Sequence, residues 1–470
     1  MPATRHAKNS QLVLTSLLNS GSSSYQVESL LGQGTFGTVV KCKNLDNKSI
    51  VAIKMIKLRD DNMKMVNQEV ATLKKLKSMD LSKCNIIQWN QYFIDTGHIC
   101  LEFEHLDRSL LNFMEERKFR PLLVKEIRPI VQQVAQALKH LKAVGIIHAD
   151  LKLDNIMLVD QLRQPYRVKL IDFGLAHEVS AAVVGSYLQT RPYRSPEILL
   201  GNRFTVAIDM WSLGCTAAAL YLGALLYPGL GEYEMITFIM ETQGQLPVTM
   251  LNKGRKTQKY FRRAVNSTSS VWKLMTPDEY RRATGKQPME NRGFKFSSLD
   301  HLVDVQPIKT HNSADRVAEI SDVNMFVDML KAMLQLDPNT RATPCEVLEH
   351  KFISMHHIAS MRKKRSYPSA PLPTSSSRIL HLMLGREKPT SPTTQAYFPA
   401  PAPSSKKLMS LILKEASREI VTSAREYMII GTLASVGRIR GPGLLSTIRP
   451  ARVLRTAPDR GSGSVGTEKR

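Results

Sequence analysis

The hydrophobic pattern of this chain becomes mostly helical near residue 107, and that change restricts the folds it can adopt. Within 25–58 and 86–103, short apolar and β-branched runs are bounded by Gly, Asn or Asp, as is typical of strands. A helical pattern at 61–77 separates these two regions. Beyond residue 107 the period is mostly helical. We therefore predict an α+β fold in which a small β-rich lobe precedes a larger helical lobe.

The second part of the chain contains four predicted helices and one irregular stretch. Residues 126–144 place their apolar side chains on one stripe, and residues 208–226 form a more apolar helix. Two further helices are expected at 323–336 and 344–350. The stretch 250–316 is polar, basic and irregular, so we predict an insertion with loops.

The formal net charge of +24 favours acidic partners such as nucleic acid, anionic membranes or phosphate groups. Residues 361–470 contain 20 Lys and Arg against 6 Asp and Glu, and they are rich in Ser, Pro and Thr. Most of the charge therefore belongs to a stretch with the composition of a disordered tail. We predict a flexible leader at 1–24, a small lobe at 25–106, a helical lobe at 107–355 and a disordered tail at 356–470.

Cysteine spacing and apolar run lengths bear on the cellular compartment. The five cysteines are widely separated, which argues against a disulfide framework and a zinc site and favours buried thiols in a reducing compartment. The first twenty residues lack the apolar core of a signal peptide. The longest apolar run, 216–226, is shorter than the roughly 20 residues that span a bilayer. We expect a soluble intracellular protein without membrane association.

The first chemical signal is the glycine-rich segment GQGTFGTV at 32–39. A dinucleotide-binding fold would place a helix directly after such a motif. Here a strand pattern follows, which fits a β-hairpin folded over the phosphates of ATP, where backbone N–H groups can approach them. On this motif alone, a plain glycine-rich hairpin explains the segment equally well.

The second signal is VAIK at 51–54, where Lys54 lies in a strand. Such a lysine can bridge the α- and β-phosphates if an anion positions it, and Glu69 on the following helix is the candidate partner. The alternative for Glu69 is a solvated helix charge, but its apolar flanking residues favour the ion pair.

The third signal is the most specific, and it consists of IHADLKLDN at 147–155 followed by IDFG at 171–174. Phosphoryl transfer needs an oriented hydroxyl, a held metal and neutralised charge. Asp150 can accept a hydrogen bond from the hydroxyl, and Lys152 can lie against the γ-phosphate. Asn155 and Asp172 offer oxygen ligands to Mg²⁺. Polar loops beside buried strands explain one carboxylate but not this ordered set, so we predict that the chain uses ATP and Mg²⁺.

With these motifs the sequence resembles the eukaryotic protein kinases from about residue 25 to 352. The resemblance includes an SPE segment with Glu197 and a DMWSLG segment with Asp209. It implies a two-lobed kinase fold in which Asp209 braces the catalytic loop and Arg341 pairs with Glu197. His148 is expected to be a structural residue of that loop.

The resemblance also implies where the nucleotide binds. Val39, Ala52 and Met157 would enclose the adenine, Phe103 would lie behind it, and Glu104 to Leu106 would form the hinge. The residues expected at the nucleotide are Leu31, Gly32, Gln33, Gly34, Thr35, Phe36, Gly37, Val39, Ala52, Lys54, Glu69, Phe103, Glu104, Leu106 and Met157.

Longer segments narrow the resemblance. The catalytic loop contains HAD instead of HRD, and the segments NIMLVDQLRQPYRVKLIDFG and SYLQTRPYRSPEILLG closely resemble the homeodomain-interacting protein kinases of the CMGC group. This implies phosphorylation of Ser and Thr, often before proline, and self-phosphorylation on Tyr187. Arg191 and Arg194 are the local cations for a phosphate there, because Ala149 cannot bind one. The alternative is that Tyr187 is a loop aromatic residue that packs on the lobe.

Two positions depart from the family pattern. Leu153 and Asp154 stand where Pro and Glu are usual, and Pro192 replaces an aromatic residue in the loop that faces the substrate. The first change leaves the predicted functional side chains intact, so we expect activity. The second leaves the substrate preference open.

Two other functions compete with catalysis as explanations of the sequence. A pseudokinase scaffold would be favoured by loss of the key lysine or aspartates, which are all present. A nucleic-acid-associated protein acting through its tail is suggested by charge alone, and the sequence has no nucleic-acid-binding motif. The basic run 362–365 fits either a nuclear import signal or a solvated charge cluster. We expect a monomer in the nucleus or cytoplasm whose partners are protein substrates, including transcriptional regulators, and we expect no direct nucleic-acid binding.

Overall fold

The computed structural model describes residues 16–358 except 35–36, 80, 267–268, 291, 293, 309 and 311. The predicted tail at 356–470 lies outside the described residues from residue 359 onward, as do residues 1–15 of the predicted leader. None of the helices within the described range is long and apolar enough to cross a membrane.

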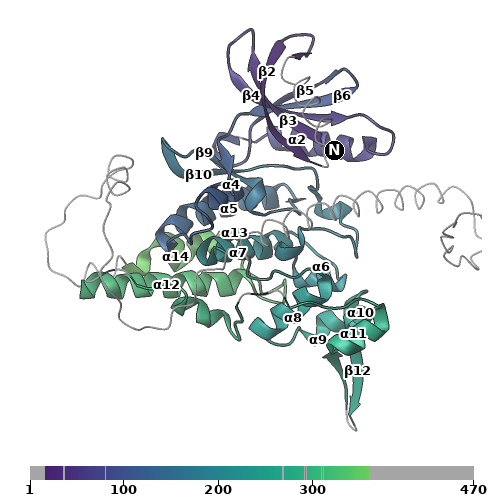
Figure 1. The fold of residues 1–470 in the computed structure, drawn as a ribbon, viewed down its shortest axis with the longest axis vertical. Coiled ribbons are helices and arrows are strands. Elements are labelled where there is room, and N and C mark those ends of the chain that lie inside the picture. Colours follow the sequence, from purple (N-terminus) through teal and green to yellow (C-terminus); the bar gives the residue numbers. More distant parts are fainter. Residues whose placement is uncertain are drawn as a thin grey trace, which may run out of the picture. The chain divides into compact units, whose positions relative to one another are not determined.

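A six-stranded antiparallel sheet in the order β1-β2-β3-β4-β6-β5 forms the first lobe (Figure 1). Its strands are β1 (Leu17–Asn19), β2 (Ser24–Gly34), β3 (Gly37–Asn44), β4 (Ile50–Lys57), β5 (Trp89–Asp95) and β6 (His98–Glu104). Helix α2 (Met63–Lys77) follows β4, and the short helix α3 (Leu81–Cys84) precedes β5. The predicted apolar face of α2 is buried, which confirms the helical pattern.

Part of the leader that we predicted to be flexible belongs to this sheet. Strand β1 pairs with β2, and Leu18 is only 2% exposed. Leu18 lies in an apolar cluster with Tyr25, Val27 and Phe93. A strand of three residues is too short to show an alternating pattern in the sequence. Strand β1 is therefore recognised only from its pairing and packing in the folded protein.

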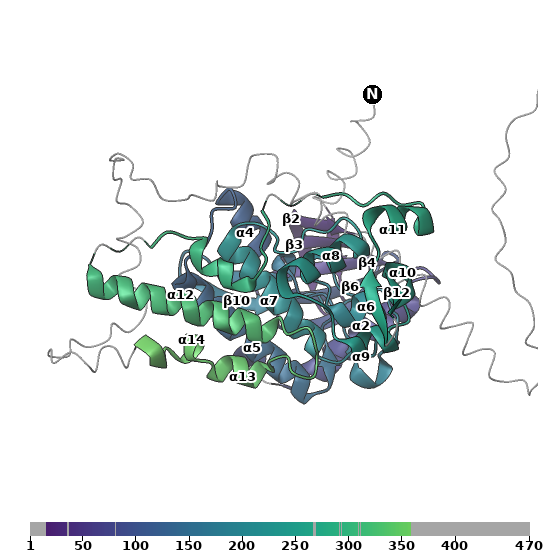
Figure 2. The same ribbon diagram turned by 90° about the horizontal axis from the view of Figure 1, so that it is seen from below.

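The second lobe is mainly helical, as predicted (Figures 1 and 2). Its longer elements are α4 (Leu110–Glu116), α5 (Val124–Ala143), α7 (Ala207–Leu222), α8 (Glu232–Gln243), α12 (Ser313–Met333) and α13 (Pro344–Glu349). Its short elements are β7 (Arg108–Ser109), β8 (Ile146–Ile147), η1 (Leu153–Asn155), β9 (Ile156–Asp160), β10 (Gln164–Leu170), β11 (His177–Glu178), η2 (Val179–Ala181), η3 (Arg191–Tyr193), α6 (Pro196–Leu200) and α14 (Lys351–Ser354).

Two helices differ from their predicted limits. Helix α7 ends at Leu222 because Gly223 has a φ of +64°, and a Cβ there would overlap the carbonyl oxygen of Phe119. Helix α12 begins at Ser313 instead of near residue 323, so its first turns lie in the stretch that we expected to be an irregular insertion with loops.

The stretch 250–316, predicted as an irregular insertion with loops, contains more helices and strands than expected. The chain from 248 onward forms α9 (Val248–Lys253), α10 (Thr257–Tyr260), β12 (Phe261–Asn266), β13 (Ser269–Leu274), α11 (Pro277–Thr284) and η4 (Leu299–Asp304). Thr276 caps α11 with its hydroxyl, and Glu279 bonds back to the Thr276 backbone. The rings of Tyr233 and Tyr280 stack with centroids 4.2 Å apart. Aromatic packing and helix caps therefore order this segment, although its many charged residues leave no regular spacing of apolar side chains.

All five cysteines lie in the described residues, and none forms a disulfide. Cys42, Cys84, Cys100 and Cys215 are buried, whereas Cys345 on α13 is exposed. Burial raises the pKa of the Cys42 and Cys100 thiols to about 12. The structure thus matches the prediction of buried thiols at four of the five positions.

Candidate active site

Lys54 projects from β4 and meets two carboxylates. Its Nζ atom lies 2.6 Å from Glu69 Oε1 on α2 and 3.0 Å from Asp172 Oδ1 in the segment after β10. The ion pair with Glu69 is the one predicted from the sequence. Burial alone would lower the pKa of Lys54, but the two carboxylates outweigh it and raise this pKa. The lysine is therefore charged at neutral pH and links the two lobes.

A second cluster surrounds Asp150. Its Oδ2 accepts hydrogen bonds from Lys152 Nζ (2.8 Å) and Asn155 Nδ2 (3.1 Å), and its Oδ1 accepts one from Thr190 Oγ1 (2.7 Å). Lys152 Nζ also donates to Thr190 Oγ1 (3.0 Å). All four side chains are buried. The structure thus brings together three residues that we predicted and one, Thr190, that we did not.

The carboxylate of Asp209 fixes the backbone that precedes Asp150. The Asp209 carboxylate accepts hydrogen bonds from the backbone N–H groups of His148 (2.8 Å) and Ala149 (2.9 Å). These bonds confirm the bracing contact that the family resemblance implied. Ala149 has a φ of +64°, and a fixed acceptor beneath the turn stabilises this conformation.

His148 is a structural residue, as expected. Its side chain is fully buried, its Nε2 lies 3.0 Å from the carbonyl oxygen of Ile171, and its ring packs edge-on against Phe173. These contacts connect the Asp150 loop to the IDFG segment.

Asn155 and Asp172 are neighbours through the backbone, because Ile171 N donates to the carbonyl oxygen of Asn155 at 2.9 Å. The Asn155 amide nitrogen is used in bonds to Asp150, which leaves the amide oxygen as the cation-binding atom of this side chain. Against the effect of burial, Lys54 lowers the pKa of Asp172, so this carboxylate is ionised. One amide oxygen and one carboxylate are the hard ligands that suit Mg²⁺ beside phosphates, so the donor set fits the expected cation.

The glycine-rich segment is the predicted hairpin. Gly34 pairs with Gly37 at the end of β2 and β3, and Thr35 and Phe36 lie outside the described residues. Gly37 has a φ of +136°, and a Cβ there would overlap the carbonyl oxygen of Met55. Leu31 is 45% exposed on β2.

The residues expected around adenine come from three strands. Ala52 on β4 lies opposite Phe103 on β6, Val39 on β3 lies opposite Lys54, and Met157 is on β9. Phe103 and Leu106 are buried, whereas Val39, Ala52 and Met157 are half-buried. The hinge is fixed at Glu104, which accepts from Gln88 N (2.6 Å) and pairs with Lys169.

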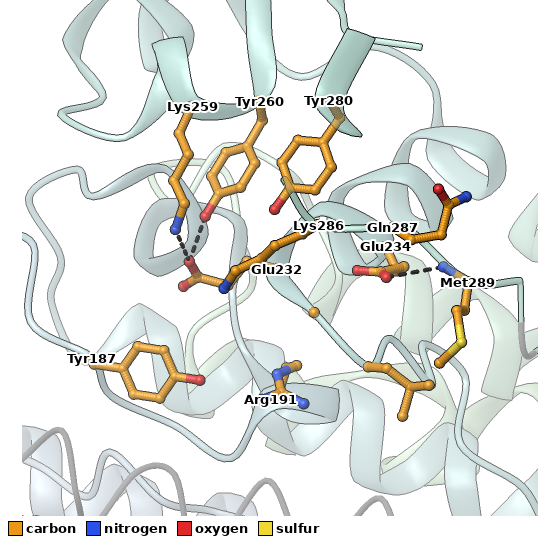
Figure 3. A pocket seen from close by; sticks show the side chains of 12 residues that line it. Tyr187, Arg191, Glu232, Glu234, Lys259, Tyr260, Tyr280, Lys286, Gln287 and Met289 are labelled. Carbon is orange, nitrogen blue, oxygen red and sulfur yellow. Dashed lines mark hydrogen bonds and ion pairs between the residues drawn. The ribbon is translucent and has the colours of Figure 1, made fainter. Parts of the chain in front are cut away.

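The segment containing Tyr187 packs on the second lobe. The Arg194 guanidinium lies 3.7 Å from the centroid of the Tyr187 ring and pairs with Glu232 (3.1 Å). Arg194 also donates to the carbonyl oxygens of Leu188 and Gln189. Figure 3 shows the Tyr187 hydroxyl pointing toward Arg191, which is itself 5% exposed. Of the two predicted cations, Arg194 thus stacks on the ring while Arg191 faces the hydroxyl.

The pair implied for the end of this segment is present. Arg341 donates to both carboxylate oxygens of Glu197, at 2.6 and 2.9 Å, and both side chains are fully buried. The contact anchors α6 to the loop before α13, which confirms the pairing.

Comparison with known proteins places this fold and site in a class. The protein kinase domain family matches residues 25–353, so the chain belongs to the protein kinases. Within that family it is similar to the homeodomain-interacting protein kinases, as the sequence motifs indicated. It is 46% identical over 348 residues to homeodomain-interacting protein kinase 1 of Mus musculus, across 74% of this chain and 29% of that protein.

Further relatives carry related names. The chain is 45% identical to homeodomain-interacting protein kinase 2 of Mus musculus over 74% of its length, and it covers 30% or less of the first two relatives. It is 37% identical to homeodomain-interacting protein kinase 4 of Mus musculus, across 73% of this chain and 57% of that protein. A protein kinase domain implies ATP and a divalent cation as cofactors and proteins as substrates.

Proposed function

We propose that this kinase transfers the γ-phosphoryl group of ATP to serine and threonine hydroxyls of protein substrates. The observation that carries the proposal is the buried cluster in which Lys152, Asn155 and Thr190 all hydrogen-bond the Asp150 carboxylate. Such a carboxylate is held in one orientation, as the orientation of an acceptor hydroxyl requires.

In the proposed step, Asp150 accepts the hydrogen bond of the substrate hydroxyl. The hydroxyl oxygen forms a bond to the γ-phosphorus while the bond to the bridging oxygen of ADP breaks, and the proton passes to Asp150. Lys152, whose amine lies 2.8 Å from that carboxylate, stabilises the negative charge on the transferred group.

Lys54 is proposed to bind the nucleotide phosphates, and Asn155 and Asp172 to hold Mg²⁺. A bound Mg²⁺ would neutralise phosphate oxygens. The residues from Leu31 to Gly37, together with Val39, Ala52, Phe103, Glu104, Leu106 and Met157, are proposed to bind the rest of ATP. Support comes from the 2.6 Å pair of Lys54 with Glu69, which fixes the amine beside the strands that carry these residues.

Radiolabel transfer to a Ser/Thr peptide library tests the assignment. The Asp150→Asn variant is expected to lose about 10³-fold in rate. Asp315→Asn is the control, because this aspartate is exposed on α12. Equal incorporation by wild type and Asp150→Asn would refute the role of Asp150 and favour a scaffold.

Self-phosphorylation on Tyr187 is also proposed. The half-buried ring lies on Arg194 and faces Arg191, so a phosphate on the hydroxyl would meet positive charge. Mass spectrometry after incubation with ATP should find phosphotyrosine at this site in wild type but not in Asp150→Asn. An unmodified Tyr187 in the active enzyme would contradict the proposal.

The names and matched ranges of the relatives support proposals about the partners, the domain limits and the cellular location of this protein. We propose that the kinase domain spans 25–355, that the chain is a monomer, and that homeodomain proteins are among its binding partners, as the relatives' names suggest. We also propose nuclear import through the basic run 362–365, which lies outside the described residues. Replacing these four residues by alanine should move a fluorescent fusion to the cytoplasm, and unchanged nuclear fluorescence would contradict the proposal.

A further inference from the structure

A cavity of about 370 Å³ lies where the Tyr187 segment, the start of α8 and the chain around α10 and α11 meet (Figure 3). We name it the insert pocket. Its charged and ring-bearing walls include Tyr187, Arg191, Glu232, Glu234, Lys259 and Lys286. The pocket thus joins the segment near the acceptor site to the ordered insert.

The insert pocket lies beside the proposed path of a protein substrate. Thr190 hydrogen-bonds Asp150, which is the proposed partner of the acceptor hydroxyl. Arg191, the next residue along the chain, lines the pocket together with Tyr187. A peptide whose hydroxyl reaches Asp150 therefore carries its neighbouring residues close to this cavity.

Both carboxylates in the pocket wall accept hydrogen bonds from the protein. Glu232 pairs with Arg194 (3.1 Å) and Lys256 (3.2 Å) and accepts a bond from the Tyr260 hydroxyl. Glu234 accepts a hydrogen bond from the backbone of Met289 at 3.2 Å. Glu232, which already has cationic partners, is therefore a poor site for a cationic ligand.

Lys286 supplies a charge that the protein does not neutralise. It is exposed, and in the described part of the chain no carboxylate forms an ion pair with it. Figure 3 shows its side chain extending across the pocket. Residues 250–286 contain ten Lys and Arg against two Asp and Glu, so the surroundings are positive as well.

We propose that the insert pocket binds an anionic side chain of the protein substrate, either a phosphorylated residue or a carboxylate, near the acceptor hydroxyl. This subsite rests on the proposed protein kinase function and assigns it a preference for acidic or previously phosphorylated substrates. Lys286 acts there as a specificity-determining point charge. In this proposal Lys286 does not contact the cluster around Asp150, and the role of Asp150 stays the same.

The test compares three peptides that differ at one position, which carries alanine, aspartate or phosphoserine and is moved stepwise along both sides of the acceptor. Wild type is compared with Lys286→Glu. Lys253→Glu is the matched control, because Lys253 is exposed in the same insert and does not line the pocket. All three proteins are first brought to equal phosphate content at Tyr187, which removes the chain's own phosphotyrosine as a variable.

At one flanking position, wild type should show a higher kcat/KM for the anionic peptides than for the alanine peptide. Lys286→Glu should reduce that ratio by about five-fold, and Lys253→Glu should leave it unchanged. A wild-type ratio of one at every position, or an equal fall in both variants, would overturn the subsite. An equal fall in the rates of Lys286→Glu on all peptides would also overturn it, because the residue would then be structural.

The subsite and the proposed function can fail separately. If wild type phosphorylates none of the peptides, the Ser/Thr activity is contradicted. Fluorescence polarisation with the phosphoserine peptide then decides about the pocket. Binding that weakens in Lys286→Glu but not in Lys253→Glu supports the pocket, and equal binding by all three proteins refutes it.

Discussion

The hydroxyl of Thr190 occupies a central place among the functional groups, although the sequence motifs assigned it no role. It donates to Asp150 Oδ1 and accepts from Lys152 Nζ, so it fixes the distance between these two side chains. Because Thr190 belongs to the segment that follows Tyr187, the position of that segment and the orientation of Asp150 depend on each other.

Replacement of Thr190 by valine should therefore impair turnover more than binding. The isosteric Thr190→Val leaves Asp150 Oδ1 without this partner, and kcat should fall by about 10- to 100-fold with little change in KM for the peptide. Thr190→Ser should restore most of the activity, because it keeps the hydroxyl. Steady-state kinetics test this, and a Thr190→Val enzyme with wild-type kcat would contradict it.

Glu232 is a second residue whose role depends on tertiary contacts. Burial alone would raise its pKa, but Arg194, Lys256, the Tyr260 hydroxyl and Lys259 together outweigh it and lower the pKa of Glu232 to about 2. The unfolded chain would protonate this carboxyl near pH 4.3. Its charge therefore stabilises the fold fully above that pH, and this contribution is lost as the pH falls toward 2.

The Glu232→Gln variant should be less stable at pH 7 by about 3 kcal/mol in free energy of unfolding, because Arg194 loses its buried partner. The difference from wild type should shrink between pH 4.3 and 2. Urea unfolding at several pH values measures both effects. Glu349→Gln, at an exposed position, serves as the control, and a difference that does not depend on pH would contradict the argument.

Motif spacing was sufficient to predict the groups that carry formal charge in the site. Lys54, Glu69, Asp150 and Asp172 each lie in a short, recognisable segment, and the structure brings them into two adjoining clusters. Thr190 lies in the quoted segment 186–201, but a threonine in a loop and a glutamate at a helix start are common, so neither Thr190 nor Glu232 was assigned a role. Their partners lie 40 and 38 positions away in the chain, and only the fold brings them together.

At the scale of elements, sequence periodicity predicted the helices that have one apolar face. The stripe of α5 is buried as expected, and Glu126 bonds back to Leu123 N (2.8 Å) to cap it. The order of the insert was missed because it comes from aromatic stacking and caps, not from a repeated apolar period. Strand β1 was missed because it is only three residues long.

Strand β1 should contribute to stability through one side chain. Leu18 is 2% exposed in the cluster with Tyr25 and Phe93, so Leu18→Ala should lower the free energy of unfolding by about 2–4 kcal/mol. Leu17→Ala, on a neighbour that is 63% exposed, should change it by less than about 0.5 kcal/mol. Denaturant titration measures both, and equal effects would show that β1 does not pack as described.

At the scale of the whole molecule, one of the contacts between the lobes is the ion pair of Lys54 and Asp172, whose charged atoms are 3.0 Å apart. A nucleotide bound by residues of both lobes should stabilise the folded state. When the concentration of Mg-ATP is about a hundred times its Kd, the free energy of unfolding should rise by about 2.7 kcal/mol. Chelation of the metal with EDTA and the Asp172→Asn change should each remove most of this gain.

Thermal or denaturant unfolding with and without the ligand measures the effect. Asp315→Asn, which changes an exposed aspartate in the same way, should keep the full stabilisation. An undiminished gain in Asp172→Asn would contradict the proposal that this carboxylate holds the metal.

The arrangement of the cysteines has a practical consequence. A thiol must ionise to act as a nucleophile, so in the native molecule a maleimide should modify Cys345 and spare the four sulfurs enclosed by the fold. The number of alkylated sulfurs, counted by intact-protein mass, would then rise from one to five as the chain opens. Cysteine alkylation can therefore report on unfolding, and Cys345 is a site at which a dye can be attached to the folded protein.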